Sequence, residues 1–192
     1  MNVKSQLYGF VSQKINYIKN FSNQSKIKST LANLRRGIGK HPGSVPEIFE
    51  ITLDGMPEQY VNASMEASDA EWAAHTALTL FALHQQGCDI KIKCMNQEGT
   101  PFGKAIRKLA SNEDDLPRVK KRFDSFVTSE NKEETAYHLR GLVQLLKSGE
   151  IPLDYPALAE DLYKFIKYPD NVRLKWGRDF YRYQKEEKDN EV

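Results

Sequence analysis

Basic side chains recur at the spacing of a single helix face in several parts of this 192-residue chain. Side chains three and four residues apart lie side by side on an α-helix, so Lys and Arg at that spacing form a cationic row. Rows that no carboxylate neutralises are typical of proteins that hold the phosphate backbone of a nucleic acid. The rows consist of Lys104, Arg107 and Lys108; Arg118, Lys121 and Arg122; Arg140 and Lys147; and Lys175, Arg178 and Arg182. Most aromatic residues fall on the opposite, apolar stripes, so we expect binding that does not depend on base sequence.

One glycine-rich segment, Gly37–His41, invites comparison with a phosphate-binding loop. That motif needs an earlier glycine where this chain has Leu34, and it needs a hydroxyl where the chain has His41. The segment therefore fails at two positions, and we do not predict nucleotide binding there.

Residues that could serve catalysis or metal binding do not converge. His75 and His84 lie nine residues apart on one predicted helix, which places them on opposite faces. The acidic residues Glu113, Asp114 and Asp115 are consecutive, so they do not point together from one helical face. The sequence predicts no catalytic residue, no metal ion and no cofactor, and therefore a protein that is not an enzyme.

Charge is distributed unevenly along the chain. Residues 1–46 carry eight basic residues and no acid, residues 47–100 carry a net charge of −7, and residues 101–192 carry +1. A basic segment without carboxylates is a candidate contact for a polyanion. The acidic middle could meet another basic surface, including that of a second copy of the chain.

Composition predicts a soluble, cytoplasmic protein with one compact domain or two small ones. The longest apolar stretch, Trp72 to Leu83, is shorter than the about 20 residues that a bilayer crossing needs, and the N-terminus lacks a signal-peptide pattern. Only two cysteines are present, Cys88 and Cys94, which can form neither a disulfide framework nor a four-cysteine zinc site. We expect both to be reduced thiols.

Hydrophobic periodicity predicts helices through most of the chain and no convincing sheet. Ser68 and Glu71 form a capping-box pattern before an Ala- and Leu-rich helix, which we expect to be the most buried one. Earlier in the chain, Ser29 can cap a helix that follows it and ends at Gly37. The predicted helices cover residues 7–18, 29–36, 68–86, 130–147, 156–167 and 170–184. Helical pattern also runs from residue 102 through 116 to 128, as two successive helices with a solvated interhelix turn at Glu113, Asp114 and Asp115. The fold class is therefore all-α, a bundle of about seven to nine helices.

The pattern also suggests a division of the chain. A long stretch without helical period, residues 88–101, separates an N-terminal helical subdomain (1–87) from a C-terminal one (102–184). Residues 185–192 are charged, and we expect them to form a frayed tail.

Five short segments, taken together and in order, resemble the CasB family, the small subunit of the type I-E CRISPR surveillance complex Cascade. The segments are residues 31–37 (LANLRRG), 101–110 (PFGKAIRKLA), 121–123 (KRF), 139–142 (LRGL) and 153–156 (LDYP). The likeness runs from about residue 29 to residue 183, so it covers most of the chain. Residues 1–28, a basic helix, have no clear counterpart.

The resemblance implies an all-helical, non-catalytic subunit with two subdomains. It implies two copies packed head to tail in a larger ribonucleoprotein, beside the other Cascade subunits and the guide RNA. There the subunit would hold the separated DNA strands of the R-loop, whose formation is nearly balanced in free energy, so that backbone contacts can tip it. The DNA-binding positions that the resemblance implies are Arg35, Arg36, Lys104, Arg107, Lys121, Arg122, Arg140, Arg173 and Lys175.

An alternative is a helical adaptor that bridges protein subunits and does not touch DNA. In that case the basic residues 1–46 and the acidic residues 47–100 are complementary docking surfaces.

Overall fold

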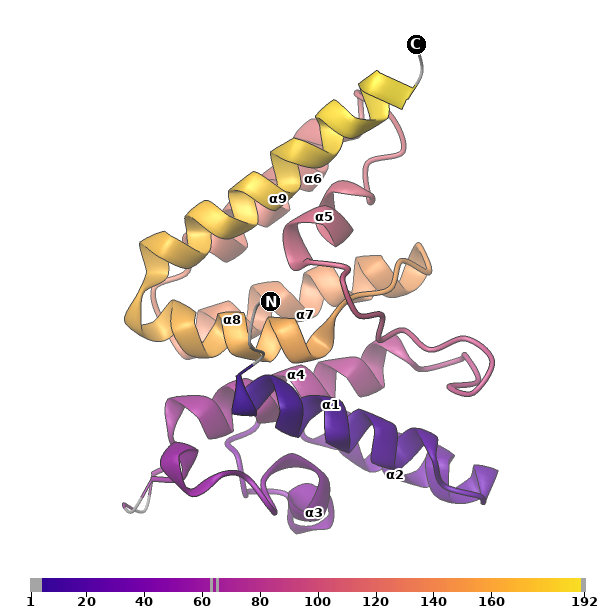
Figure 1. The fold of residues 1–192 in the computed structure, drawn as a ribbon, viewed down its shortest axis with the longest axis vertical. Helices are drawn as coiled ribbons and strands as arrows, with labels where there is room; N and C mark the ends of the chain where they lie inside the picture. The colour runs from indigo at the N-terminus through magenta and orange to yellow at the C-terminus, as the bar shows by residue number, and fades with distance from the viewer. Residues whose placement is uncertain (1–4, 63, 65, 191–192) are drawn as a thin grey trace.

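A computed structural model describes residues 5–62, 64 and 66–190, with residues 183–190 described by backbone alone. The described part consists of helices joined by loops (Figure 1), which confirms the all-α fold class. Its one β-type pairing is an isolated bridge between Asn96 and Leu153. The α-helices are α1 (Gln6–Lys19), α2 (Gln24–Arg36), α3 (Phe49–Thr52), α4 (Asp69–His84), α5 (Phe102–Arg107), α6 (Leu116–Val127), α7 (Lys132–Ser148), α8 (Tyr155–Lys167) and α9 (Pro169–Asn190), and the two 3-10 helices are η1 (Pro46–Ile48) and η2 (Glu58–Tyr60).

Helix α4 lies at the centre of the fold. The predicted capping box starts it: the Ser68 hydroxyl accepts a hydrogen bond from the Glu71 N–H, and the Glu71 carboxylate accepts one from the Ser68 N–H at 2.7 Å. Helices α1, α2, α7 and α8 pack around α4 (Figure 1), and nearly every one of its side chains is buried. A helix that is apolar on all sides is expected in such an enclosed position.

A second layer of the core joins α5, α6, α8 and α9 through aromatic rings. The ring of Trp176 lies 4.9 to 5.5 Å from the rings of Phe102, Phe126 and Phe165, measured between centroids. Helix α5 approaches α9 so closely that a Cβ atom on Gly103 would collide with the carbonyl oxygen of Trp176. Only glycine allows this approach, because it has no Cβ atom.

The two parts predicted from the sequence share one hydrophobic core. Helix α8, which follows the 88–101 loop, packs against α1 and α4, which precede it. A continuous cluster of buried side chains runs from Leu7 in α1 to Phe180 in α9. The division into two subdomains remains a prediction.

Several predicted helix boundaries are wrong. Helix α2 starts at Gln24 because Asn23, and not Ser29, caps it by accepting hydrogen bonds from two backbone N–H groups. The helix predicted from Phe102 is short and ends at Arg107, and the predicted interhelix turn at Glu113, Asp114 and Asp115 lies directly before α6. Helix α9 continues to Asn190, beyond the predicted end at 184; residues 191 and 192 of the predicted tail lie outside the described residues. The short helices α3, η1 and η2 were not predicted at all.

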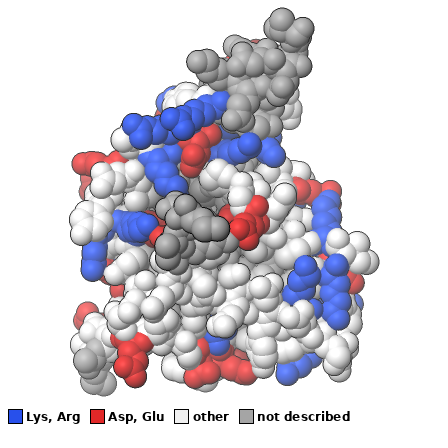
Figure 2. All heavy atoms as spheres, viewed as in Figure 1, with Lys and Arg blue, Asp and Glu red and all other residues white. Residues whose placement is uncertain are grey.

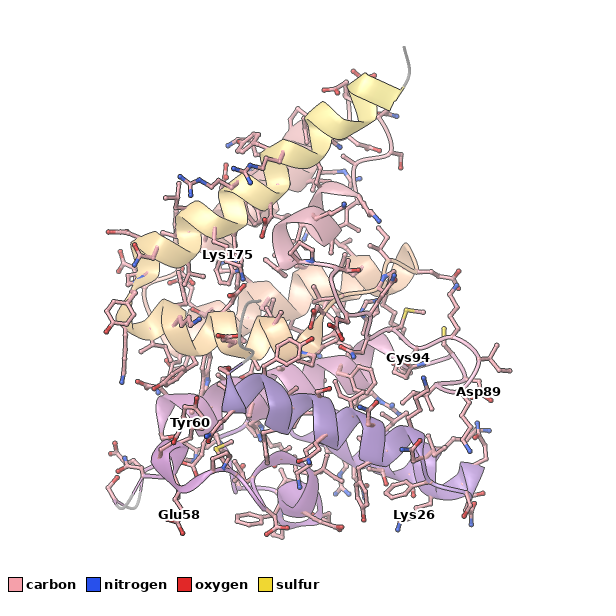
Figure 3. The ribbon with its side chains drawn as sticks, in the orientation of Figure 1. Lys26, Glu58, Tyr60, Asp89, Cys94 and Lys175 are labelled. Atoms are coloured by element: carbon pink, nitrogen blue, oxygen red, sulfur yellow. The ribbon has the colours of Figure 1, made fainter. Side chains whose placement is uncertain are left out.

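The loop that follows α4 is held by side-chain contacts rather than by a sheet. Buried Gln85 donates to the carbonyl oxygens of Cys88 and Lys93, and it accepts a hydrogen bond from the Met95 N–H at 2.8 Å. Figure 3 shows Asp89 and Cys94 in this loop, at the opposite side of the fold from Tyr60. Both cysteines are free thiols, as predicted, and burial raises the pKa of Cys94.

The basic and acidic segments contact each other within the chain. Arg36 lies 3.8 Å from the carboxylate of Glu47. The Lys14 ammonium donates to the carbonyl oxygen of Glu50 at 2.6 Å, and the Tyr17 hydroxyl donates to the Glu50 carboxylate at 3.0 Å. Part of the charge segregation seen in the sequence is therefore satisfied inside one molecule.

Candidate nucleic-acid interface

A groove of about 730 Å³ runs between α6 and α7 and is lined by four cationic side chains. We call it the α6–α7 groove. Its lining residues are Arg118, Lys121, Arg122 and Ser125 from α6, and Tyr137, His138, Arg140, Gly141, Leu142 and Gln144 from α7. No carboxylate is among these lining residues. A groove whose described lining carries four cations and no carboxylate attracts polyanions, because the acids beside it, such as Asp115, neutralise only part of its charge.

The sequence determines which face of α6 points into the groove. Val119, Phe123 and Phe126 are spaced three and four residues apart and are buried in the core. The cationic residues 118, 121 and 122 fall on the other side of the helix, where they are exposed. On α7, Leu139 and Val143 are buried in the same way, and Arg140 is exposed. The amphipathic pattern of both helices thus positions the four cations.

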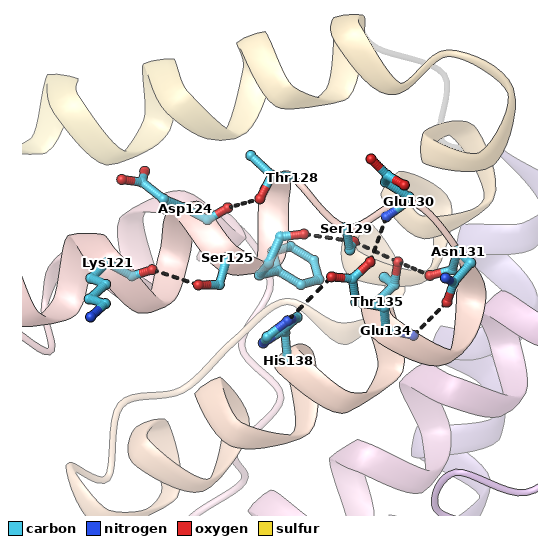
Figure 4. Close-up of polar contacts among 11 residues, drawn as sticks. Lys121, Asp124, Ser125, Thr128, Ser129, Glu130, Asn131, Glu134, Thr135 and His138 are labelled. Atoms are coloured by element: carbon cyan, nitrogen blue, oxygen red, sulfur yellow. Dashed lines mark hydrogen bonds and ion pairs between the residues drawn. The ribbon is translucent and has the colours of Figure 1, made fainter.

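A hydrogen-bonded turn fixes the angle between α6 and α7 (Figure 4). The Ser129 hydroxyl contacts the Phe126 carbonyl at 2.8 Å and the Thr135 hydroxyl at 2.7 Å. The Asn131 side chain caps α7 by accepting a hydrogen bond from the Glu134 N–H, and the Glu134 carboxylate accepts one from the Glu130 N–H at 2.9 Å. These contacts make the groove a preformed feature of the fold.

Three of the four groove cations have no acidic partner among the described residues. Arg118 contacts Asp115 at 3.2 Å at the start of α6. Within the part of the chain that the structure describes, no carboxylate oxygen lies within 4 Å of the side-chain nitrogens of Lys121, Arg122 or Arg140. A phosphate group could pair with these cations without displacing an existing ion pair.

The predicted cationic row on α5 does not form as expected. Arg107 is buried, with 6% of its side chain exposed, and its guanidinium lies 3.7 Å from the Glu113 carboxylate. Helix α5 is short and packs against α6, α7 and α9, which leaves no open face for three cations. Lys104 is half-buried and Lys108 is exposed, and neither lines the α6–α7 groove.

The predicted DNA-binding residues at the start of α9, Arg173 and Lys175, form hydrogen bonds within the protein. Lys175 donates to both carboxylate oxygens of Asp161 in α8, at 2.5 and 2.6 Å, and Figure 3 shows it between these two helices. Arg173 donates to the Val127 carbonyl at 2.6 Å and to Asp170 at 3.1 Å. Lys175 therefore holds α9 against α8, Arg173 holds α9 against the end of α6, and neither lines the α6–α7 groove.

Asp161 explains why Lys175 is held there. Its carboxylate is buried and also accepts a hydrogen bond from the Trp176 indole N–H at 2.9 Å. Burial raises the pKa of Asp161, and the nearby Lys175 ammonium opposes that rise. The cation therefore compensates a buried charge.

Arg35 and Arg36 lie at the end of α2, far from the groove in sequence and outside its lining. Arg35 is half-buried against the Ala82 carbonyl at 3.4 Å, and burial lowers its pKa. Arg36 is exposed beside Glu47. The fold does not bring these two residues together with Lys121 and Arg122.

On the face shown in Figure 2, basic side chains gather over α9 and acidic ones gather along the lower edge. The exposed basic residues of the described part of α9 include Arg178 and Arg182, which flank the exposed Leu174 and Tyr181. This second basic surface lies on the outer side of α9 and is separate from the α6–α7 groove.

Sequence reasoning did not assign six of the ten described lining residues to the site, among them Tyr137 and His138. Tyr137, Arg140 and Gln144 are spaced three and four residues apart, opposite the buried Leu139 and Val143. An aromatic residue on the polar face of an amphipathic helix is the signal that could have identified Tyr137.

The two histidines of α4 have separate structural contacts. The Nε2 of His75 lies 2.9 Å from the Gly37 carbonyl oxygen and donates to it, and the Nδ1 of His84 lies 2.9 Å from the Tyr155 hydroxyl. Burial lowers the pKa of His75, and it lowers that of His84 to about 4. Both imidazoles are thus neutral near pH 7. Among the described residues, no three His, Cys, Asp or Glu side chains meet in a way that could hold a metal ion.

A smaller cavity of about 350 Å³ contains part of the glycine-rich segment. Its lining carries Lys40 and Lys132 but also Glu66 and Glu133, so it does not share the uniform charge of the groove. In the described part of the chain, no helix is both long and apolar enough to cross a membrane.

Comparison with known proteins is consistent across sequence and structure. The family described as CRISPR-associated protein Cse2 matches residues 30–181. The Cse2 protein of Thermus thermophilus is 25% identical over 180 residues, which is 93% of this chain and 95% of that protein. The crystal structure of CasB from Thermobifida fusca is 35% identical, with a TM-score of 0.74 over 92% of this chain and 98% of that one. A chain of a CRISPR RNA-guided surveillance complex has the same fold, with a TM-score of 0.73 at 18% identity over 97% of this chain and 99% of that one.

Proposed function

Since the chain belongs to the CRISPR-associated Cse2 family, we propose that it is a non-catalytic small subunit of a CRISPR RNA-guided surveillance complex of the Cascade type. In this role it binds the backbone of DNA without sequence specificity and stabilises the R-loop. Its partners are the other Cascade subunits, the guide RNA and a second copy of itself packed head to tail, all in the cytoplasm. The family match supports the assignment to the complex, and the groove supports the DNA contact.

The observation that carries the DNA contact is the set of four cations in the α6–α7 groove, among whose described lining residues there is no carboxylate. Each Lys or Arg that neutralises a phosphate releases a condensed counterion, which gives affinity that falls with salt. Exchange of a DNA duplex for a guide–target heteroduplex is nearly balanced in free energy, so a few such contacts can tip it. Arg118, Lys121, Arg122 and Arg140 are the residues we assign to this contact.

The set of residues proposed to contact DNA therefore differs from the set predicted from the sequence. Lys104 on α5 and Lys108, which directly follows α5, remain candidates for a flanking contact because α5 packs next to α6. Arg107, Arg173 and Lys175 are withdrawn, because their side chains already contact protein groups. Arg35 and Arg36 would have to contact a different stretch of nucleic acid.

The test is DNA binding by the purified protein, measured by fluorescence anisotropy over a range of salt concentrations. The double variant Lys121→Ala/Arg122→Ala should bind more weakly and should lower the salt slope by about 1.4 for single-stranded DNA, about 0.7 per phosphate contact. The matched control Lys91→Ala/Lys167→Ala removes two exposed positive charges outside the groove. It should retain the native slope.

A second outcome favours the adaptor function. If the native protein shows no salt-dependent binding, or if both double variants weaken binding equally, the groove does not hold DNA. The internal contacts of residues 14, 17 and 36 with residues 47 and 50 already satisfy part of the charge that the adaptor function would use. For that reason we place the adaptor second.

A further inference from the structure

Tyr137 is the most exposed large hydrophobic side chain in the groove lining, with 75% of its surface accessible. The rings of Phe102, Phe126 and Trp176 in this half of the fold are buried against one another. Tyr168 and Tyr181 are exposed as well, but neither is among the described lining residues of the groove. Among the described residues, the one ring contact of Tyr137 is edge-on to its neighbour His138, at 5.3 Å between centroids. The flat face of the phenol ring is therefore not stacked on another ring of the described chain.

Gly141 leaves the neighbouring position on α7 open. It lies four residues after Tyr137, on the same helix face, and it also lines the groove. A Cβ atom on Gly141 would meet no other atom within 4 Å. The groove thus has free space beside an exposed aromatic ring, and Arg140 and Arg122 lie in the same lining.

We propose that Tyr137 is a base-stacking residue, which makes the α6–α7 groove select single-stranded DNA over duplex DNA. This inference rests on the proposed function and goes beyond it, because phosphate contacts alone do not separate the two forms. In a duplex the bases are already stacked and paired, so their faces are not available to a side chain. In a single strand one base can stack on the tyrosine ring while its flanking phosphates contact the cations.

The stacked ring and the cations contribute differently to binding. Stacking on an aromatic side chain is tolerant of base identity and adds affinity without releasing counterions. Loss of Tyr137 should therefore lower the affinity for single strands and leave the salt slope unchanged. Loss of Lys121 and Arg122 should lower the salt slope for both forms of DNA.

The experiment compares Tyr137→Ala with Tyr137→Phe, which keeps the ring and removes the hydroxyl. Affinities for a single-stranded oligonucleotide and for its duplex are measured by anisotropy at one salt concentration. Tyr137→Ala should weaken single-strand binding by about 5- to 100-fold, whereas Tyr137→Phe should bind like the native protein. Duplex binding should be the same for all three. Because Tyr137 is exposed, both variants should fold, which their urea midpoints will verify.

A second readout reports stacking directly. A strand that carries 2-aminopurine should lose fluorescence when it binds the native protein or Tyr137→Phe, and should lose less with Tyr137→Ala. A strand with abasic sites in place of bases should bind the native protein and Tyr137→Ala equally.

The outcomes separate this inference from the proposed function. If the native protein shows no salt-dependent binding to either form of DNA, both are overturned. If Lys121→Ala/Arg122→Ala weakens binding while Tyr137→Ala has no effect, or weakens single-strand and duplex binding equally, the proposed function stands and the stacking role of Tyr137 is overturned.

Discussion

Helices α6 and α9 carry cationic residues at the same helical spacing but in different surroundings. Lys121 and Arg122 of α6 extend into an open groove whose described lining has no carboxylate. Lys175 of α9 is drawn against α8 by a buried carboxylate, that of Asp161. Spacing determines which residues share a helix face, whereas the buried partner of a neighbouring helix decides whether that face is available for a ligand.

The same contrast applies to the glycines of the two regions. Gly103 lies where α5 meets α9, and no room exists for a side chain there. Gly141 lies in the groove, and the space around it is open. The α5–α8–α9 region is thus built for tight packing, and the groove is built for access. Five predictions test this comparison.

The largest effect is expected from Gly103→Ala. The added methyl group would collide with the Trp176 carbonyl oxygen and would lie 2.8 Å from the Phe180 nitrogen, both backbone atoms that cannot rotate away. Helices α5 and α9 would have to separate, at a cost of about 3 kcal/mol in the free energy of unfolding. Urea denaturation measures it. A loss near zero would mean that α5 is not held against α9 as described.

Lys175→Ala should destabilise the fold without changing DNA binding. It removes the partner of the buried Asp161 carboxylate, and loss of one member of a buried pair costs about 3 to 5 kcal/mol. Because 49% of the Lys175 side chain is exposed, water screens the pair and we expect about 2 kcal/mol.

The groove double variant Lys121→Ala/Arg122→Ala is the matched comparison. It should leave the urea midpoint near the native value and lower DNA affinity, the reverse of Lys175→Ala. If Lys175→Ala weakened DNA binding as strongly and left stability intact, α9 would belong to the interface and the comparison would fail.

The pH dependence of the Lys175→Ala deficit sharpens this test. Burial raises the pKa of Asp161 above its unfolded value of 3.8, so its protonated form favours the folded state, and stability is lost as pH rises through the folded pKa. Removing Lys175 raises the pKa of Asp161 further, so in the variant this loss of stability continues to higher pH. The difference in stability between the variant and the native protein should be larger at high pH, where Asp161 is ionised in both, and should shrink as the pH falls through the folded pKa of Asp161 in the variant.

Both proteins also lose stability on acidification through His84, because burial lowers its pKa to about 4 while the unfolded chain protonates near 6.5. That loss is common to both and cancels in the difference, which urea titrations at each pH will give. A deficit that does not change with pH would show that Lys175 does not stabilise the fold through the ionised Asp161 carboxylate.

The sequence was sufficient to predict the all-α class, the capping box of α4 and the exposed cations of α6, because each depends on local spacing. It was insufficient for Arg107 and Lys175. Their environment is set by helices distant in sequence, and a row that looks exposed on one helix is covered when another helix packs on it. The sequence also could not predict that Arg140 of α7 lines the same groove as the cations of α6, because that depends on the turn at Ser129, which sets the angle between the two helices.

The helix boundaries that were predicted wrongly have local causes. Asn23 and Ser29 are both good capping residues, and the choice between them depends on Ile27, whose burial in the core keeps the first turn of α2 helical. The short helices after Pro46 are too brief to produce a periodic pattern. Such segments take their conformation from the core they cover.

The smallest effect is expected from Gly141→Ala, and it should be stabilising. Glycine inside a helix costs about 1 kcal/mol relative to alanine, and α7 has room for the added methyl group, which meets no atom within 4 Å. We expect the free energy of unfolding to rise by about 0.5 to 1 kcal/mol, measured by urea denaturation beside Gly103→Ala. Gly141→Ala should thus raise the free energy of unfolding and Gly103→Ala should lower it, because Gly141 faces the open groove and Gly103 lies in the close α5–α9 contact. A destabilising Gly141→Ala would mean that α7 is covered at this position, which would also remove the space that a base stacked on Tyr137 requires.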